Sequence, residues 1–321
     1  MTRPLNRRQS LKILGAALAL PAGILSMRGL GHPAELARWS GETLGGLSNI
    51  PLWHPDKRIA ERAIAQMLAE VDRLEDIFSL YRPNSEISRL NREGRLDKVS
   101  PDLQLVLDHS QQIAQSSEGA FDPTIQPLWR FYASGATDLT GLDCVLRLVD
   151  YTAIFRDRNS LRLGQSGMAI SLNGIAQGYI TDRITELLGN QGFENAMIEL
   201  GETRALGVAP DGLAFSVGIL DPASPSQIQS EISLSNAALS VSGGYGTTFN
   251  RLGADHIFDP HNGQSPHLLR QVAVIAPKAI WADALSTAIY VAGEGAARQL
   301  LATKPGARAI LYRNDGTLVH C

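Results

Sequence analysis

The chain has 321 residues, 44% of them hydrophobic and 19% charged, which is ordinary for a globular protein and excludes collagen-like, low-complexity and disulfide-rich classes. The length is sufficient for one large domain or two smaller ones around a substantial core. The net charge of −3 is unevenly distributed: residues 1–34 hold five of the 29 Lys and Arg and no Asp or Glu, which leaves 24 cations against 32 anions, or −8, in the rest. An acidic chain is a poor candidate for nucleic-acid binding, and we expect no such partner.

The basic N-terminus has the pattern of an export signal. Arg7 and Arg8 precede Lys12 and an apolar run over residues 13–25, which is too short for a comfortable membrane span. The paired arginines resemble a twin-arginine signal, whereas an amphipathic or buried N-terminal helix is the alternative. We therefore expect residues 1–34 to be a signal and linker, the twin-arginine export machinery to be a partner, and residues 35–321 to form a periplasmic domain.

The first half of the chain is predicted to be mainly helical. Gly and Pro residues predict an irregular segment or a short strand over 32–56. Apolar residues at helical spacing then predict a long amphipathic helix within 56–81. After a turn at 82–84, Ser85 and Glu86 open a short helix. Further helical structure is expected over 101–117 and, in pieces between loops, over 119–150.

The second half mixes strands with helices. Strands are expected near residues 152–156, 160–163, 168–172, 195–200, 214–220, 228–234, 237–242, 271–276 and 307–313. Helices are expected over 174–188, 279–292 and 295–302. Because strands and helices do not alternate steadily, the sequence predicts an α+β fold with mixed or antiparallel sheets flanked by helices rather than a doubly wound sheet.

Familiar catalytic and nucleotide-binding signatures are absent. There is no Walker A loop, no G-x-G-x-x-G after a predicted strand, no H-E-x-x-H and no G-x-S-x-G. His256, His261 and His267 are spaced by five and six residues, which fits neither one helix face nor a zinc finger. We therefore expect no metal site built from these three histidines.

Four other segments combine small residues with carboxylates and hydroxyls. In the first, over 119–124, Asp122 precedes a proline and is held extended, which suits a carboxylate directed at a ligand, although a plain Asp-Pro turn is equally compatible. In the second, over 172–182, two glycines lead from a strand into a helix N-terminus that would favour an anion, although they could also form a simple connection. The third combines residues 240–245 with 256–263.

The fourth segment, over 282–288, carries an oxygen pair. Asp283 and Thr287 are four residues apart in a predicted helix, so their oxygens project from one face. Such oxygens match Mg²⁺ completed by phosphate and water. Alternatively, the Asp caps the helix and the Thr bonds back to the preceding turn.

Taken together and in this order, these segments and the Ser79–Asn91 region resemble the ApbE family, the FAD:protein FMN transferases, from about Leu44 to Ala292. In that family a Ser or Thr hydroxyl of a target protein attacks the FMN-side phosphorus of Mg²⁺-bound FAD, and AMP leaves. The resemblance implies FAD contacts from Leu44, Tyr81, Ala120, Phe121, Asp122, Gln177, Asp182 and Ile257. It also implies that the Gly174 carbonyl, Asp283 and Thr287 hold Mg²⁺, while His256, or in competition Asp283, takes the acceptor proton.

Four stretches depart from the usual family pattern. Leu44-Gly45-Gly46 replaces Met-Gly-Thr, Gln177 replaces a Lys or Glu, Gly201-Glu202-Thr203 replaces Gly-Gly-Asp, and residues 259–263 replace Asp-Pro-Arg-Thr-Gly with Asp-Pro-His-Asn-Gly. The Asn-Gly-Ile-Ala-Gln-Gly-Tyr form and the signal resemble the NosX branch. That branch is associated with nitrous oxide respiration, where a membrane flavoprotein receives FMN. A non-catalytic flavin-binding accessory protein and an FAD pyrophosphatase remain as alternative functions.

Overall fold

The computed structural model describes residues 35–43, 46–54, 56–136, 138–249 and 253–321. The predicted export signal at 1–34 and the expected flavin contact Leu44 lie outside these ranges. Within them, no helix combines the length and the apolar character needed to cross a bilayer.

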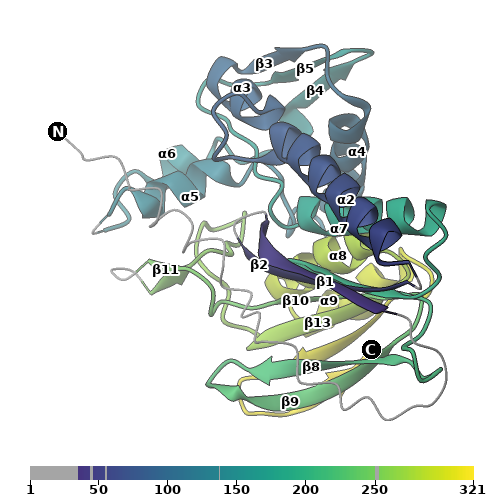
Figure 1. Cartoon of the computed structure of the whole chain (residues 1–321). Coiled ribbons are helices and arrows are strands. Elements are labelled where there is room, and N and C mark those ends of the chain that lie inside the picture. The colour runs from purple at the N-terminus through teal and green to yellow at the C-terminus, as the bar shows by residue number, and fades with distance from the viewer. Residues whose placement is uncertain (1–34, 44–45, 55, 137, 250–252) are drawn as a thin grey trace.

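An eight-stranded sheet forms the centre of the protein, in the order β1-β2-β6-β7-β10-β13-β14-β15 (Figure 1). Its strands are β1 (Glu35–Thr43), β2 (Gly46–His54), β6 (Ala196–Leu200), β7 (Glu202–Leu206), β10 (Ala238–Ser242), β13 (Gln271–Ala276), β14 (Arg308–Tyr312) and β15 (Leu318–His320). Every neighbouring pair is antiparallel. The α+β prediction is therefore confirmed, with an antiparallel sheet. The segment expected to be irregular or one short strand instead forms the β1–β2 hairpin.

Helices cover one face of this sheet, with α2, α7 and α8 above it in Figure 1. The helices are α2 (Lys57–Phe78), α3 (Glu86–Glu93), α4 (Pro101–Ser116), α5 (Gln126–Ala133), α6 (Leu142–Leu146), α7 (Ala176–Asn190), α8 (Ala279–Ala292) and α9 (Glu294–Ala302). The predicted long helix is confirmed as α2, whose N-cap Asp56 accepts a hydrogen bond from Arg58 N at 2.8 Å. Its buried stripe includes Met67, Val71 and Leu74, which fixes the face that packs on the core.

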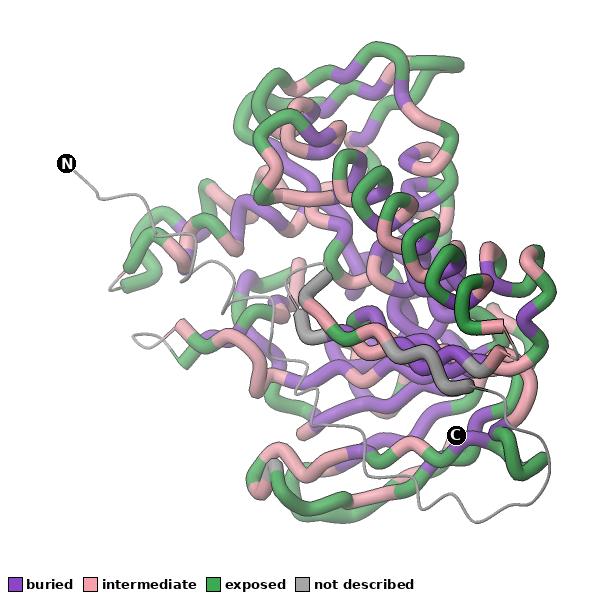
Figure 2. The backbone as a smooth tube through the Cα atoms, in the orientation of Figure 1, coloured by how far each residue is buried: buried purple, intermediate pink, exposed green. Residues whose placement is uncertain are grey.

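A hairpin of β8 (Phe215–Asp221) and β9 (Ser224–Leu234) packs on the opposite face of the sheet. Strand β13 shows the two-sided burial directly, because Val274 belongs to the helix-side core and Ile275 to the hairpin-side core. Figure 2 shows this central region as the most deeply buried part of the chain. The sheet is thus a buried layer between helices and a hairpin.

Short strands form two further small sheets. One contains β3 (Arg95–Asp97), β5 (Ser160–Leu163) and β4 (Ile154–Asp157), which follows the 3-10 turn Tyr151–Ala153, and the other pairs β11 (Thr248–Phe249) with β12 (Ala254–Asp255). The predicted strand at 168–172 is wrong. Its residues are mostly buried, but the backbone bonds a side chain and a loop instead of another strand: Ile170 N donates to Asn91 Oδ1 at 2.6 Å and Ser171 N to the Pro123 carbonyl at 2.8 Å.

Candidate functional site

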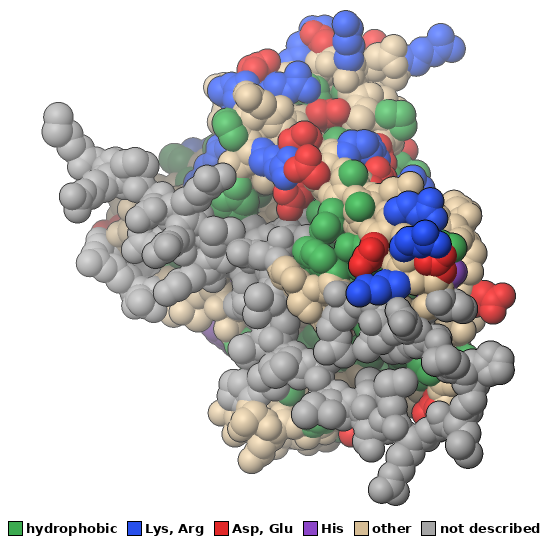
Figure 3. Space-filling model, in the orientation of Figure 1, with side chains coloured by type: hydrophobic (Ala, Val, Ile, Leu, Met, Phe, Trp, Pro, Cys, Tyr) green, Lys and Arg blue, Asp and Glu red, His purple; other side chains and the backbone are tan. Residues whose placement is uncertain are grey.

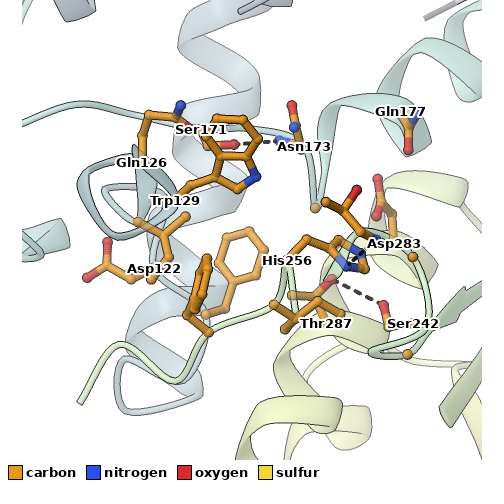
Figure 4. A pocket seen from close by; sticks show the side chains of 18 of the residues that line it. Asp122, Gln126, Trp129, Ser171, Asn173, Gln177, Ser242, His256, Asp283 and Thr287 are labelled. Carbon is orange, nitrogen blue, oxygen red and sulfur yellow. Dashed lines mark hydrogen bonds between the residues drawn. The ribbon is translucent and has the colours of Figure 1, made fainter. Parts of the chain in front are cut away.

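A cavity opens where segments distant in the sequence meet, between the α5 region, the N-terminal end of α7 and the first turns of α8 (Figure 4). Of the expected site residues, those that line it are Tyr81, Ala120, Phe121, Asp122, Gly174, Gln177, His256, Ile257, Asp283 and Thr287. The fold therefore brings together ten predicted positions that span more than 200 residues of sequence.

The close approach of α7 to α8 positions the carboxylate of Asp283. Gly178 N, in the first turn of α7, donates to Asp283 Oδ2 at 2.9 Å. A Cβ atom at Gly178 would lie 2.4 Å from the Ala279 carbonyl oxygen and 2.8 Å from Asp283 Cβ, so only glycine permits this contact. Gly178 is therefore needed for the close packing of α7 against α8, and it leaves its backbone N–H accessible to Asp283.

Oxygen-bearing side chains gather at this end of the cavity. Ser242 Oγ lies 3.2 Å from Thr287 Oγ1 (Figure 4). It also lies 2.8 Å from Ser286 Oγ, and the two contacts connect β10 to α8. Glu202, at the start of β7, also lines the cavity and interacts electrostatically with Asp283. In the sequence Glu202 is visible only as a departure from the family pattern, and the fold places it beside Asp283.

The protonation of these two carboxyl groups reflects their confinement. Burial, with a further contribution from nearby Asp182, raises the pKa of Asp283 to about 8. Burial, and then the neighbouring Asp283, raises the pKa of Glu202 well above its ordinary value. A bound cation would offset the repulsion between these two carboxylates and favour their charged forms.

The donor set suits a hard cation. Asp283, Glu202 and Thr287 offer carboxylate and hydroxyl oxygens, and Gly174 lies next to Thr287, since a Cβ atom there would be 3.1 Å from Thr287 Oγ1. Magnesium prefers such oxygens and completes its shell with water and phosphate. Within the described ranges there is no cluster of three or more His, Cys, Asp or Glu that could hold a metal ion.

His256 is exposed to the cavity, in view between Trp129 and Asp283 (Figure 4). Its Nδ1 accepts a hydrogen bond from Thr247 N at 3.3 Å. The surrounding protein atoms lower the pKa of His256, because desolvation disfavours the charged imidazolium. This direction favours the neutral imidazole, the form that can accept a proton.

Apolar and aromatic side chains form a further part of the cavity lining, the aromatic wall. Tyr81, Phe121 and Ile257 were expected there, and the structure adds Trp129 and Phe258. Trp129 lies in α5, within a region predicted only to hold helical pieces between loops. A clustering of aromatic residues at 129–132 is the one signal that could have identified this wall.

Asp122 lines the cavity, but its two carboxylate oxygens accept hydrogen bonds from its own loop and from the 3-10 turn at Tyr151. Oδ1 accepts from Thr124 N at 2.7 Å and Thr124 Oγ1 at 2.6 Å, while Oδ2 accepts from Tyr151 N at 3.0 Å. Burial raises the pKa of Asp122. The turn-forming alternative therefore describes its contacts here, and the loop that it shapes supplies Ala120 and Phe121 to the cavity.

Asp182 is the one expected site residue in the described ranges that does not line the cavity. Its carboxylate accepts from Ala279 N at 2.8 Å and Ile280 N at 3.1 Å, and it pairs with Arg204. A carboxylate at these free amide groups caps the N-terminus of α8. In this structure Asp182 holds the helix that carries Asp283, and the flavin contact expected of it stays a prediction.

The fold and the cavity together are those of an α+β protein with one cavity lined by oxygen-bearing side chains and by an aromatic wall. The chain belongs to the ApbE family, whose sequence profile matches residues 45–311. The FAD:protein FMN transferase of Vibrio cholerae is 30% identical over 293 residues, which cover 85% of this chain and 86% of the relative. That of Treponema pallidum is 28% identical and covers 94% of this chain and 91% of its own.

Solved structures confirm the ApbE-like fold. The flavin transferase ApbE from Vibrio cholerae superimposes with a TM-score of 0.79 at 24% identity, over 90% of this chain and 97% of its own. The ApbE protein of Thermotoga maritima gives a TM-score of 0.78 at 24% identity, over 89% and 96%.

Proposed function

We propose that the chain is a Mg²⁺-dependent FAD:protein FMN transferase that moves FMN from FAD to a Ser or Thr hydroxyl of an acceptor protein and releases AMP. The observation that carries this proposal is the composition of one cavity: an aromatic wall, the oxygens of Asp283, Glu202 and Thr287, and a neutral His256. Its family membership and the named activity of its relatives support the same assignment.

The residues present fit a bound magnesium ion. Asp283, Thr287 and the Gly174 carbonyl would hold it, with Glu202 near enough to Asp283 to add negative charge. When bound, Mg²⁺ supplies charge neutralisation at the pyrophosphate and at the leaving AMP. The aromatic wall of Tyr81 and Trp129 suits the flavin ring by burying its apolar faces.

The acceptor hydroxyl must lose a proton as its oxygen bonds to the FMN-side phosphorus and the bond from that phosphorus to the AMP oxygen breaks. We assign that proton to Nδ1 of His256, where it replaces the hydrogen bond from Thr247 N. Asp283 is the weaker candidate, because one of its oxygens already accepts from Gly178 N and its charge is needed beside the cation.

We further propose export to the periplasm by the twin-arginine machinery, on the pattern of residues 1–34. The NosX-like sequence over 173–179 suggests that the acceptor is the membrane flavoprotein of nitrous oxide respiration. A nucleic-acid partner is not proposed. On the face drawn in Figure 3, acidic and basic side chains are intermixed. Arg73 and Arg82, for example, form salt bridges with neighbouring carboxylates.

The full chain is incubated with FAD, MgCl₂ and a periplasmic flavoprotein domain, with EDTA and a Ser/Thr→Ala acceptor as controls. A Mg²⁺-dependent gain of one FMN on the acceptor, with one AMP released, supports the proposal. Tight FAD binding without transfer to a validated acceptor would instead indicate a flavin carrier. Release of AMP and free FMN without an acceptor would indicate a pyrophosphatase.

A further inference from the structure

His261 joins two walls of the cavity through its two ring nitrogens. Its Nδ1 lies 2.8 Å from Asp259 Oδ1, and its Nε2 lies 2.9 Å from the carbonyl oxygen of Glu118. Glu118 begins the loop that brings Ala120 and Phe121 to the cavity, whereas His261 ends the segment that brings His256 and Ile257. One imidazole thus connects the two segments across 143 residues of sequence.

Both partners of this imidazole can only accept hydrogen bonds. A carboxylate and a backbone carbonyl have no proton to donate, and a neutral imidazole carries one N–H only. Both contacts are hydrogen bonds at once only when the ring is the doubly protonated imidazolium. Loss of one proton leaves Asp259 or the Glu118 carbonyl facing a nitrogen lone pair, so one of the two contacts becomes repulsive.

The local backbone holds the ring in this position. Asp259 Oδ1 also accepts from His261 N at 2.9 Å, and the Asp259 carbonyl accepts from Gly263 N at 2.8 Å, which closes a tight turn around the imidazole. On the other side, Gly119 has φ +88°, and a Cβ atom there would lie 3.4 Å from His261 Nε2. The Glu118 carbonyl is therefore presented to the ring by a loop that favours glycine at its next residue.

We propose that His261 is a positioning residue: its imidazolium fastens the 118–122 loop to the 256–263 segment, and the affinity of the cavity for FAD falls as pH rises and this imidazolium loses its proton. The identity of the ligand rests on the proposed function, whereas the contact itself does not. Because His261 does not line the cavity, it acts through Ala120, Phe121 and Ile257 rather than by touching the flavin.

The charges around the ring support its protonation. The hydrogen bond to Asp259 has the largest effect and raises the pKa of His261; desolvation opposes it, and the Glu118 carbonyl and Asp122 favour the charged form further. Glu118 contributes its backbone, and the ring of Tyr151 packs near Gly119 on the same side. Since the folded-state pKa is raised, the contact is complete below the ordinary histidine pKa and is lost as pH rises through the raised value.

The test uses the full chain and two variants. His261→Arg keeps a permanent charge with several donors, and His261→Gln has no charge. The dissociation constant of FAD is measured by flavin fluorescence from about pH 6 to about pH 9, and each variant is compared with the unchanged chain at the same pH. Titration of Asp283 and His256 is common to all three proteins and cancels in these ratios.

At low pH we expect His261→Gln to bind FAD about three- to tenfold more weakly than the unchanged chain, a range set by one partly exposed charge-assisted hydrogen bond. This ratio should approach one at high pH, where His261→Arg should bind more tightly than the unchanged chain. A His261→Gln ratio that is constant across the pH range overturns the proposal.

A second measurement needs no flavin. In ¹³C/¹⁵N-histidine NMR of the unliganded chain, the signal missing from both variants belongs to His261. Its pKa should exceed that of an ordinary histidine, about 6.5, and amide exchange at 118–122 should accelerate above it. A pKa at or below the ordinary value overturns the proposal. If this titration is seen but the chain binds no FAD, the contact stands and the proposed function fails.

Discussion

Gly178 N of α7 donates a hydrogen bond to Asp283 Oδ2 of α8 at 2.9 Å, and this single contact connects the packing of two helices to the chemistry of the cavity. The backbone of one helix fixes the carboxylate of the other. The other carboxylate oxygen of Asp283, Oδ1, takes no part in this hydrogen bond. Changes that separate the helices are therefore expected to affect both stability and cation binding.

Gly178→Ala is expected to lower the free energy of unfolding by about 1–3 kcal/mol, because its Cβ atom would overlap the Ala279 carbonyl. It should also weaken Mg²⁺ binding by displacing Asp283. Gly189→Ala, later in the same helix and with nothing within 4 Å of its Cβ, is the matched control. It should stabilise the protein by about 0.5–1 kcal/mol. Urea denaturation of both variants tests this, and equal effects would contradict the packing argument.

Asp283→Asn is expected to stabilise the protein in the absence of Mg²⁺ at alkaline pH. The pKa of Asp283 is raised from 3.8 to about 8, so between these values the folded state holds a proton that the unfolded state has lost. Stability therefore falls as pH rises across this window, by a few kcal/mol in order of magnitude, and the Asn variant escapes that loss. At pH about 8.5 its Tm should be about 3–10 °C higher than that of the unchanged chain.

Addition of MgCl₂ should reverse this order, because the ion stabilises only a chain that binds it. Asp283→Asn should also lose transfer activity. Asp211→Asn, an exposed aspartate between β7 and β8, serves as the control and should change neither property. A Tm of Asp283→Asn that rises with MgCl₂ as much as that of the unchanged chain would refute the cation site.

His256→Gln is expected to reduce the transfer rate by about 10²- to 10⁴-fold, the usual effect of losing a general base. FAD affinity should change little. Because the pKa of His256 is lowered, the rate of the unchanged chain should rise with pH through the acidic range and then level as the imidazole becomes neutral. His267→Gln is the control. A rate within tenfold of the unchanged chain would assign the proton to another group.

Two substitutions of Thr287 separate the contribution of its hydroxyl to Mg²⁺ binding from that of its side-chain shape. Thr287→Ser keeps the oxygen and should retain Mg²⁺ affinity within a few-fold, whereas the nearly isosteric Thr287→Val should lose about 10- to 100-fold. Ser242 keeps its partner Ser286 in both variants, so the neighbouring network stays satisfied. Isothermal titration with MgCl₂ distinguishes the two. Equal affinities would remove Thr287 from the ligand set.

The sequence was sufficient for features encoded by local spacing. The four-residue separation of Asp283 and Thr287 placed their oxygens on one helix face, and α2 followed from its apolar period. Residues brought in by tertiary contacts were harder to identify. Glu202 begins the short, polar strand β7, which has no strand-like apolar pattern, and its site role depends on the pairing of β7 with its neighbours.

Asp182 shows the converse difficulty. The family resemblance implied a flavin contact for this carboxylate, but nothing in the sequence indicated that it also binds amide groups of a helix that begins almost 100 residues later. No local pattern indicates such a cap between distant segments. The same applies to residues 168–172, whose apolar run fits a strand although their backbone bonds Asn91 and the Pro123 carbonyl instead.

Strand β10 lies between two apolar layers, so apolar burial alone does not fix its register. A slip by one residue would exchange its two faces, and both faces are apolar environments. Ser240 and Ser242 fix the register, because their hydroxyls reach Ser286 of α8 at 3.0 and 2.8 Å only in the observed alignment. After a slip they would enter the hairpin-side layer without partners, at a cost of about 1–3 kcal/mol each. Since Ser242 also contacts Thr287, the alignment of a central strand and the position of a proposed magnesium ligand are set by the same two serines.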